Sequence, residues 1–211
     1  MDGVIFDTER HCISCWKKLA AEHGFEDVEP TFVKCIGTTE EVTRHIFLER
    51  YGEDFPFSQY DREVRRQTRE LSDAGKLPLK TGVFEILSEL QNREIPLALG
   101  SSNDTVSIRR ELENAGLLSY FSQVIGGDMV KRGKPFPDIF LSAGEALLKT
   151  PKQCYVIEDS FNGIRAAGRA GMHPIMVPDM LEPDSEIRDI AEIVLPSLHE
   201  ALSYLLAVID A

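Results

Sequence analysis

Five short apolar runs in the second half of the chain constrain the fold more than any other feature of the sequence. Each run is almost wholly apolar, which is typical of a strand buried on both faces of a parallel sheet. The segments between them have helical spacing, and Gly116 and Gly171 follow two of these segments where glycine commonly ends a helix. The pattern predicts a Rossmann-like, doubly wound α/β core. The runs are residues 96–99, 123–125, 155–157, 174–177 and 193–195.

The segment 8–74 has a different character. It holds the single Trp of the chain, and Ile13, Trp16 and Leu19 recur at helical spacing. We therefore predict an all-helical cap inserted into the core. The predicted domains are residues 1–7 with 75–211 for the α/β core and 8–74 for the cap.

Charge and hydropathy exclude several kinds of partner. The 211 residues include 23 Lys and Arg against 35 Asp and Glu, a net charge of -12, which is the wrong sign for binding a phosphate backbone. No apolar run approaches the roughly 20 residues that span a bilayer. We expect a cytoplasmic monomer with no nucleic-acid or membrane partner. Cys12 and Cys15 are spaced C-x-x-C, and we expect reduced thiols on one helix.

The residues that follow each apolar run are candidates for a binding site, because open parallel sheets bind ligands beyond the carboxyl ends of their strands. Ser101, Ser102 and Asn103 follow the first run and lead into a helix. Backbone N–H groups and hydroxyls at a helix N-terminus suit a phosphate. Simple helix capping by Ser or Asn is the alternative.

Two consecutive acids, Glu158 and Asp159, follow the third run. Adjacent carboxylates repel each other, so a cation would stabilise them, and Mg²⁺ is commonly held by one or two carboxylates plus substrate phosphates. An acid that serves the helix dipole would explain one carboxylate better than two. Lys134 stands beside a turn made rigid by Pro135 and Pro137, which suits a charge clamp, although an isolated lysine is usually a solvated surface residue.

The N-terminal stretch adds a fourth polar patch. From the residues alone, Val4 to Phe6 could be a strand with Asp7 at its carboxyl end, close to Asp2. Acids, hydroxyls and a lysine at the ends of several strands are typical of phosphoryl transfer. The four patches are Asp2 with Asp7, Ser101 with Ser102, Lys134, and Glu158 with Asp159.

Four stretches of the chain resemble, in order, the four motifs of the haloacid dehalogenase superfamily. They are DGVIFDTE, LALGSSN, GKPFPDIF and VIEDSFNGI. The chain is most similar to the β-phosphoglucomutase-like phosphatases, which carry a helical cap after the first motif.

The resemblance implies a role for each motif residue. It makes Asp2 the general acid/base, Lys134 the group that neutralises developing charge, and Ser101 a phosphate-binding hydroxyl, with Ser102 and Asn103 beside it. Asp2, Glu158 and Asp159 would hold Mg²⁺. The resemblance also places residues 3–6 just after the active-site loop instead of in a strand.

One departure from the family concerns the nucleophile. The first Asp of the family's Asp-x-Asp motif, and the strand that carries it, would lie directly before Met1. We expect the natural protein to begin upstream, with an apolar β-rich run that ends in Asp. Because a covalent nucleophile supplies most of the rate acceleration, we expect the 211-residue form to be at least about a thousandfold less active.

The expected function is Mg²⁺-dependent hydrolysis of a small phosphorylated metabolite, such as a sugar phosphate, through an aspartyl-phosphate intermediate. A sugar phosphomutase is one alternative. In that group a His stands in the first cap helix where this chain has Cys12, with His11 one position away, and basic residues surround a turn that here lies at Gly37 and has none. A non-catalytic protein that binds phosphate ligands is the other alternative.

Overall fold

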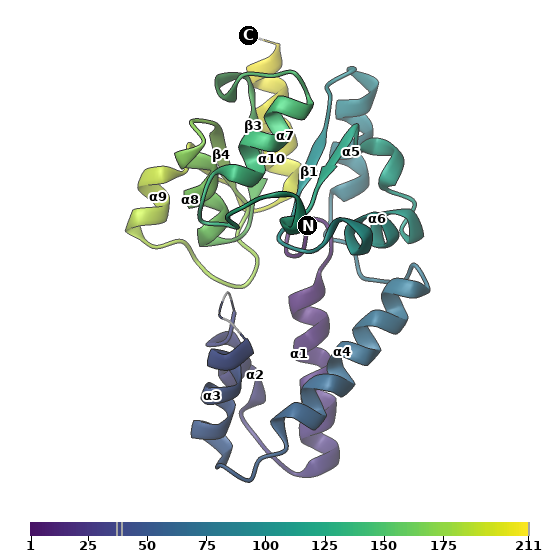
Figure 1. Cartoon of the computed structure of the whole chain (residues 1–211), viewed down its shortest axis with the longest axis vertical. Helices are drawn as coiled ribbons and strands as arrows, with labels where there is room; N and C mark the ends of the chain where they lie inside the picture. The colour runs from purple at the N-terminus through teal and green to yellow at the C-terminus, as the bar shows by residue number, and fades with distance from the viewer. Residues whose placement is uncertain (37, 39, 211) are drawn as a thin grey trace.

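The computed structural model describes residues 1–36, 38 and 40–210, which form a helical unit and an α/β unit (Figure 1). The helical unit contains α1 (Thr8–His23), α2 (Val28–Val33), α3 (Glu40–Tyr51) and α4 (Phe57–Asp73). The strands of the α/β unit are β1 (Ala98–Gly100), β2 (Gln123–Ile125), β3 (Tyr155–Glu158), β4 (His173–Met176) and β5 (Ile193–Val194). Its helices are α5 (Val83–Asn92), α6 (Thr105–Asn114), α7 (Asp138–Ala146), α8 (Phe161–Arg169), α9 (Ser185–Ile190) and α10 (Leu198–Ile209).

The helical unit has a hydrophobic core of its own, built around Trp16 on α1. The Trp16 ring lies 4.5 Å from that of Phe47 on α3 and 6.0 Å from that of Phe57 on α4, centroid to centroid. These residues come together because the apolar positions of each helix fall on one face. In the described part of the chain, no helix has the length and apolar character needed to cross a bilayer.

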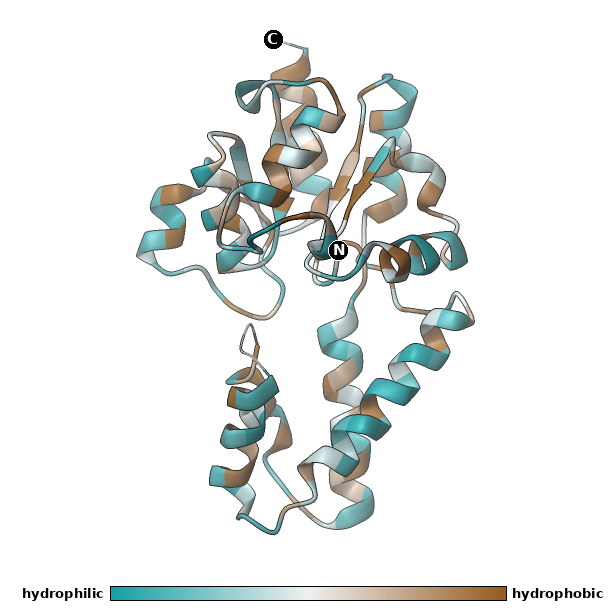
Figure 2. Cartoon of the chain, viewed as in Figure 1, coloured by the Kyte–Doolittle hydropathy of each residue, from teal (hydrophilic) through white to brown (hydrophobic). Residues whose placement is uncertain are grey.

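The α/β unit is a three-layer arrangement of parallel strands between helices (Figure 1), which confirms the predicted fold class. Successive strand residues face opposite layers: Val156 packs with residues of α7 and α8, whereas Ile157 packs with residues of α5 and α10. Both layers are apolar, so the strands are coloured as largely hydrophobic in Figure 2. This burial on two faces explains why the strands appear in the sequence as uninterrupted apolar runs.

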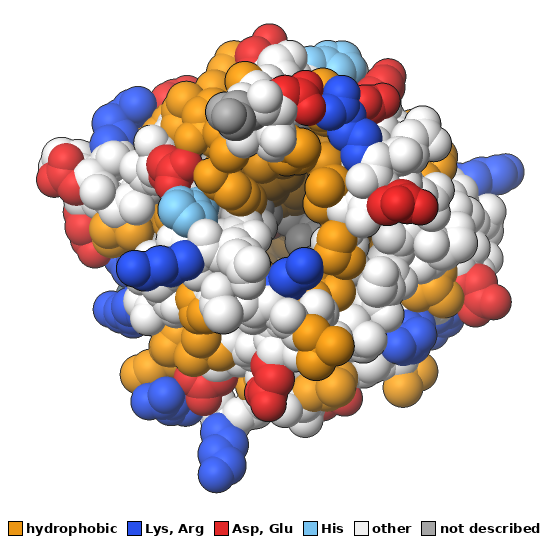
Figure 3. Space-filling view, turned by 90° about the horizontal axis from the view of Figure 1, so that it is seen from above, with side chains coloured by type: hydrophobic (Ala, Val, Ile, Leu, Met, Phe, Trp, Pro, Cys, Tyr) orange, Lys and Arg blue, Asp and Glu red, His pale blue; other side chains and the backbone are white. Residues whose placement is uncertain are grey.

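The strands differ from the prediction in one respect: within the described residues they form two sheets instead of one. β1 pairs with β2, and β3 pairs with β4, which pairs with β5. A cavity of about 490 Å³ lies between β1 and β3. Seen from the end opposite the helical unit, the surface is hollowed near its centre, with hydrophobic side chains along the upper and right sides of the hollow (Figure 3).

Residues 1–7 form a turn, so the interpretation of Val4 to Phe6 as a strand is wrong. Gly3 has a φ of +72°, a conformation that favours glycine, and its N–H donates to the Phe6 carbonyl at 2.9 Å. The chain therefore folds back on itself before it enters α1. The return connection from α4 runs alongside, where Asp7 N–H donates to the Pro78 carbonyl at 2.8 Å.

Candidate active site

The side chain of Asp2 is held at both carboxylate oxygens. Thr8 Oγ1, in the first turn of α1, donates to Asp2 Oδ1 at 3.0 Å, and Asn103 Nδ2, beyond β1, donates to Asp2 Oδ2 at 3.1 Å. These two donors come from different units of the molecule. Together they fix the carboxylate at the junction between the helical unit and the carboxyl end of β1.

The loop after β1 places a buried hydroxyl beside Asp2. Ser101 is only 5% exposed, and its Oγ accepts a hydrogen bond from the Asn103 backbone N–H at 3.3 Å. The hydroxyl hydrogen of Ser101 is then free to donate to an anion. Ser102 and Asn103 lie exposed on the same loop. Capping does not explain this loop, because Asp104 is the residue that caps α6, accepting from Ser107 N–H at 2.9 Å.

Lys134 brings its charge to the carboxyl ends of two strands at once. Its side chain is 10% exposed, its Nζ pairs with Glu158 Oε1 at the end of β3, and it donates to the Gly100 carbonyl of β1 at 3.4 Å. The ammonium also lies 4.9 Å from the ring centroid of Phe140. Contacts of this kind restrict a flexible side chain to one position.

Glu158 is oriented by the start of α8. Its Oε2 accepts from Ser160 N–H at 3.1 Å and from Ser160 Oγ at 2.9 Å. A Cβ at Gly163 would lie 2.1 Å from the Glu158 carboxyl carbon, so only glycine leaves room for this arrangement. Burial alone would raise the pKa of Glu158, but the Lys134 ammonium, the Met1 amino group and these hydrogen bonds hold it below its ordinary value.

The side chain of Asp159 lies in close contact with the N-terminal turn. A Cβ at Gly3 would lie 2.0 Å from Asp159 Oδ2, so the absence of a side chain at Gly3 makes this contact possible. Burial, followed by the negative charge of Glu158, raises the pKa of Asp159 to about 7. The protein thus holds a buried carboxyl whose negative charge is poorly compensated.

The described residues contain no group of three His, Cys, Asp or Glu side chains able to hold a metal ion. Of the three acids predicted to bind Mg²⁺, Glu158 is paired with Lys134, and both oxygens of Asp2 accept hydrogen bonds. Among the described residues, Asp159 is the one of these three acids for which no side-chain ion pair or side-chain hydrogen bond is seen. One carboxylate oxygen donor together with substrate phosphate oxygens is a set that Mg²⁺ commonly accepts, so the residues present fit this ion.

Sequence reasoning missed two contributors near the site. Asp179 follows β4, and its side chain is 3% exposed. Lys80 Nζ lies 2.5 Å from Asp179 Oδ1, while among the described residues Asp179 Oδ2 has no hydrogen-bond partner. The sequence does carry a signal for Asp179, because this acid lies two residues after the apolar run 174–177, at the carboxyl end of a predicted strand. Thr8 gives no such signal, because its contact with Asp2 depends on how the N-terminal turn enters α1.

The structure brings members of all four predicted patches together, with Asn103 representing the loop that carries Ser101 and Ser102. Asp2 contacts Asn103, Lys134 contacts Glu158, and the turn at Gly3 contacts Asp159. Asp7 lies at the junction of the units instead, 3.4 Å from Arg10 Nε. The turn at Gly37, on which the phosphomutase comparison partly rests, lies outside the described residues.

Known proteins resemble this chain along most of its length. A family model described as "Haloacid dehalogenase-like hydrolase" matches residues 1–177. A phosphorylated carbohydrates phosphatase from Thermotoga maritima is 30% identical over 175 residues, which are 83% of this chain and 81% of that protein. The β-phosphoglucomutase of Bacillus subtilis is 27% identical over 209 residues, 95% of this chain and 92% of that protein.

A solved structure shows the same fold. The crystal structure of a HAD family hydrolase from Deinococcus radiodurans R1, which has bound phosphate and sodium, matches with a TM-score of 0.81 at 25% identity. The match covers 97% of this chain and 92% of that one. The family model, the relatives and the fold give one answer: the chain belongs to the haloacid dehalogenase-like hydrolases.

Proposed function

We propose that this protein is a phosphatase that hydrolyses a small phosphorylated metabolite of the sugar-phosphate class. The observation that carries the proposal is the convergence of Asp2, Ser101 and the Lys134–Glu158 pair at the carboxyl ends of β1 and β3. An acid, a hydroxyl donor and a fixed cation are the groups needed to bind a phosphate and to protonate its leaving oxygen. The similarity to a phosphatase of phosphorylated carbohydrates supports this substrate class.

In the proposed reaction, a carboxylate oxygen attacks phosphorus and the bond from phosphorus to the sugar oxygen breaks. Asp2, protonated for this step, donates its proton to the leaving oxygen. Asp2 then takes a proton from water, which attacks phosphorus, releases inorganic phosphate and restores the first carboxylate. The attacking carboxylate is that of an Asp directly before Met1, the position given by the family resemblance.

The remaining residues bind and neutralise the phosphoryl group. The Ser101 hydroxyl donates to a phosphate oxygen, and Lys134 neutralises charge on the equatorial oxygens. Glu158 acts as a positioning residue through its pairing with Lys134. Asp159 would hold Mg²⁺, which when bound would supply further stabilisation of charge on the phosphoryl oxygens.

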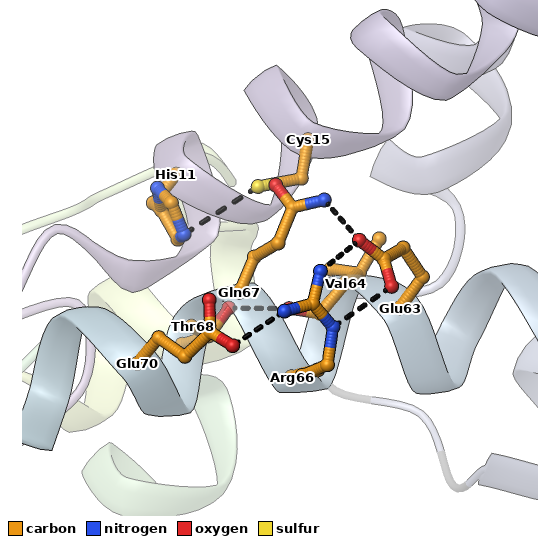
Figure 4. Close-up of polar contacts among 8 residues, drawn as sticks. All are labelled: His11, Cys15, Glu63, Val64, Arg66, Gln67, Thr68 and Glu70. Atoms are coloured by element: carbon orange, nitrogen blue, oxygen red, sulfur yellow. Dashed lines mark hydrogen bonds and ion pairs between the residues drawn. The ribbon is translucent and has the colours of Figure 1, made fainter.

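Hydrolysis is favoured over the phosphomutase alternative by the first cap helix. Burial raises the pKa of the Cys12 thiol to about 12, so this position offers no group that exchanges protons near neutral pH. His11 is turned along α1, where its Nε2 lies 3.4 Å from Cys15 Sγ (Figure 4). The same view shows that Arg66 of α4 donates hydrogen bonds to Glu63 and Glu70. The charge of this basic residue of the helical unit is therefore already paired with two carboxylates.

The test is release of inorganic phosphate from a panel of sugar and polyol phosphates, with Mg²⁺ or with EDTA, by the chain carrying Asp directly before Met1. Asp2→Asn should lower kcat by at least about a hundredfold, since it removes the proton donor. Asp54→Asn, an exposed acid of the helical unit, is the matched control. Interconversion of hexose 1- and 6-phosphates would contradict the proposal in favour of a mutase. Tight phosphate binding without turnover would contradict it in favour of a non-catalytic binder.

A further inference from the structure

Asp179 is a buried acid at the junction of the two units. It lies three residues beyond the end of β4, and its side chain is only 3% exposed. Burying a carboxylate costs free energy unless a charge of opposite sign stands beside it. Lys80 Nζ supplies that charge at 2.5 Å from Asp179 Oδ1, and the Lys80 side chain is itself only 17% exposed. Because a buried ion pair often contributes little net stability, its place in the fold is the better guide to its role.

Lys80 belongs to the connection by which the chain returns from the helical unit to the core. This return connection is hydrogen-bonded to the connection that leads into α1. The Lys80 N–H donates to the Ile5 carbonyl at 2.8 Å, and the Asp7 N–H donates to the Pro78 carbonyl at 2.8 Å. Lys80 Nζ also lies 3.8 Å from Asp7 Oδ1. The two connections therefore form one ribbon, and the ion pair with Asp179 holds this ribbon to the core.

The helical unit reaches the same acid through Arg10, in the first turn of α1. Arg10 Nε lies 3.4 Å from Asp7 Oδ1 and 3.8 Å from Asp179 Oδ1. Two acids and two bases thus meet at the junction: Asp7, Asp179, Lys80 and Arg10, which we call the junction cluster. The Arg10 side chain is 58% exposed, so water screens its charge, and the buried pair of Lys80 with Asp179 is the stronger link.

The helical unit also meets the core where the end of α4 lies against α6 (Figure 1). Asn114 Nδ2 of α6 donates to the Ser72 carbonyl of α4 at 3.0 Å. A Cβ at Gly75 would lie 2.3 Å from the Asn114 carbonyl oxygen, so the chain passes close to α6 as it leaves α4. A body held at one seam can still rotate about it. The junction cluster supplies a second point of attachment, which sets the angle between the units.

The angle between the units matters because α1 begins beside the candidate active site. Thr8, in the first turn of this helix, donates to Asp2 Oδ1 at 3.0 Å, so a rotation of α1 would carry Thr8 away from Asp2. The charge of Asp179 is felt on both sides of this contact. With burial as the largest cause, it adds to the raised pKa of Glu9 on α1 and to that of Asp159 in the core.

We propose that Asp179 is a positioning residue, which fixes the angle between the helical unit and the core through Lys80 and Arg10 and so keeps Thr8 at Asp2. The fixing of the angle rests on the contacts of the junction cluster alone. Its importance for the proton donor Asp2 rests on the proposed function.

The experiment measures the distance between two spin labels by double electron–electron resonance, with no substrate present. The labels are attached at Glu49→Cys on α3 and Asp189→Cys on α9, two exposed positions on helices that lie on the side of the molecule away from α6 (Figure 1). The four native cysteines are replaced by Ala in every protein compared.

Three variants are compared with this labelled parent. The first is Asp179→Asn, and the second combines Lys80→Met with Asp179→Asn, so that neither charge of the buried pair remains. The third is the matched control Glu182→Gln, an acid of the same loop whose side chain is 87% exposed. The readouts are the width of the distance distribution and the Tm.

Both variants that lack the Asp179 carboxylate should broaden the distance distribution at least about twofold, and Glu182→Gln should leave it unchanged. Asp179→Asn strands the Lys80 ammonium and should lower the Tm by at least about 5 °C, whereas the double variant should recover most of this loss. A merely structural role would restore the distribution together with the Tm. That result, or a distribution that stays narrow in both variants, would overturn the proposal. Because the labels report the angle without substrate, broadening supports the proposal even if the protein releases no phosphate.

Discussion

The two units of this molecule bury their apolar side chains in different ways. The helical unit surrounds Trp16 with rings from α3 and α4 and leaves Trp16 only 2% exposed. The α/β unit has well-packed helices on both faces but a groove of about 490 Å³ at its centre. A helix satisfies its own backbone, whereas an inner strand needs a neighbour on each side. The two units therefore differ in the kind of space they leave: the groove of the α/β unit is lined mainly by apolar side chains, whereas the pocket of about 310 Å³ between α1 and α4 is lined mainly by polar ones.

Replacing Trp16 should give the largest loss of stability. Trp16→Ala removes a buried aromatic side chain that packs with the rings of Phe47, Phe57 and Tyr60, and should lower the free energy of unfolding by about 3–5 kcal/mol. The measurement is urea denaturation followed by far-UV circular dichroism. Phe84→Ala, which truncates a ring on α5 that is 48% exposed, should change stability by less than about 1 kcal/mol. Equal losses would contradict the description of a closed core in the helical unit.

A matched pair of leucines tests the difference between the units directly. Leu48 of α3 is 6% exposed and Leu87 of α5 is 7% exposed, but Leu87 lines the groove. Leu48→Ala should cost about 3–4 kcal/mol and Leu87→Ala about 2 kcal/mol, because a residue beside an existing cavity loses fewer contacts. Equal costs at the two positions would contradict this difference in packing between the units.

The smallest effect is expected from a substitution at the outer edge of the larger sheet, where Glu192 contributes to the dependence of stability on pH. Burial tends to raise the pKa of Glu192, but hydrogen bonds from Tyr204 and His173 bring it below the ordinary value of 4.5. The folded pKa is thus lower than the unfolded one, so this contribution is full above about pH 4.5 and is lost as the pH falls through the folded pKa. Glu192→Gln should flatten the acid limb of a Tm-against-pH curve slightly. Glu113→Gln, at an exposed position of α6, should leave that limb unchanged.

The five strands of the α/β unit, and two helix ends set by glycine, could be predicted from the sequence alone, whereas the strand at Val4 to Phe6 was predicted wrongly. Each apolar run corresponds to one strand, and Gly116 and Gly171 have the positive φ values, +72° and +71°, of helix-ending glycines. These features are readable because they depend on local pattern and on backbone conformation.

The candidate site was less predictable because its contacts join distant segments. Glu158 and Asp159 are adjacent and looked alike, yet Gly163 lets Glu158 turn to α8 and Lys134 while Gly3 brings the N-terminal turn against Asp159. Neighbouring acids therefore have opposite pKa shifts. No local pattern reports which way a side chain turns after a strand ends.

The most direct test of the central claim is equilibrium binding of inorganic phosphate to the 211-residue chain by isothermal titration calorimetry with Mg²⁺ present. Ser101→Ala should weaken binding about tenfold, since it removes one hydrogen bond to a charged ligand. Lys134→Ala combined with Glu158→Gln, which leaves no buried charge unpaired, should weaken it further. Lys131→Ala, an exposed lysine of the same loop, should stay within about twofold of the parent. Equal affinity in all four proteins would contradict a phosphate site at the carboxyl ends of β1 and β3.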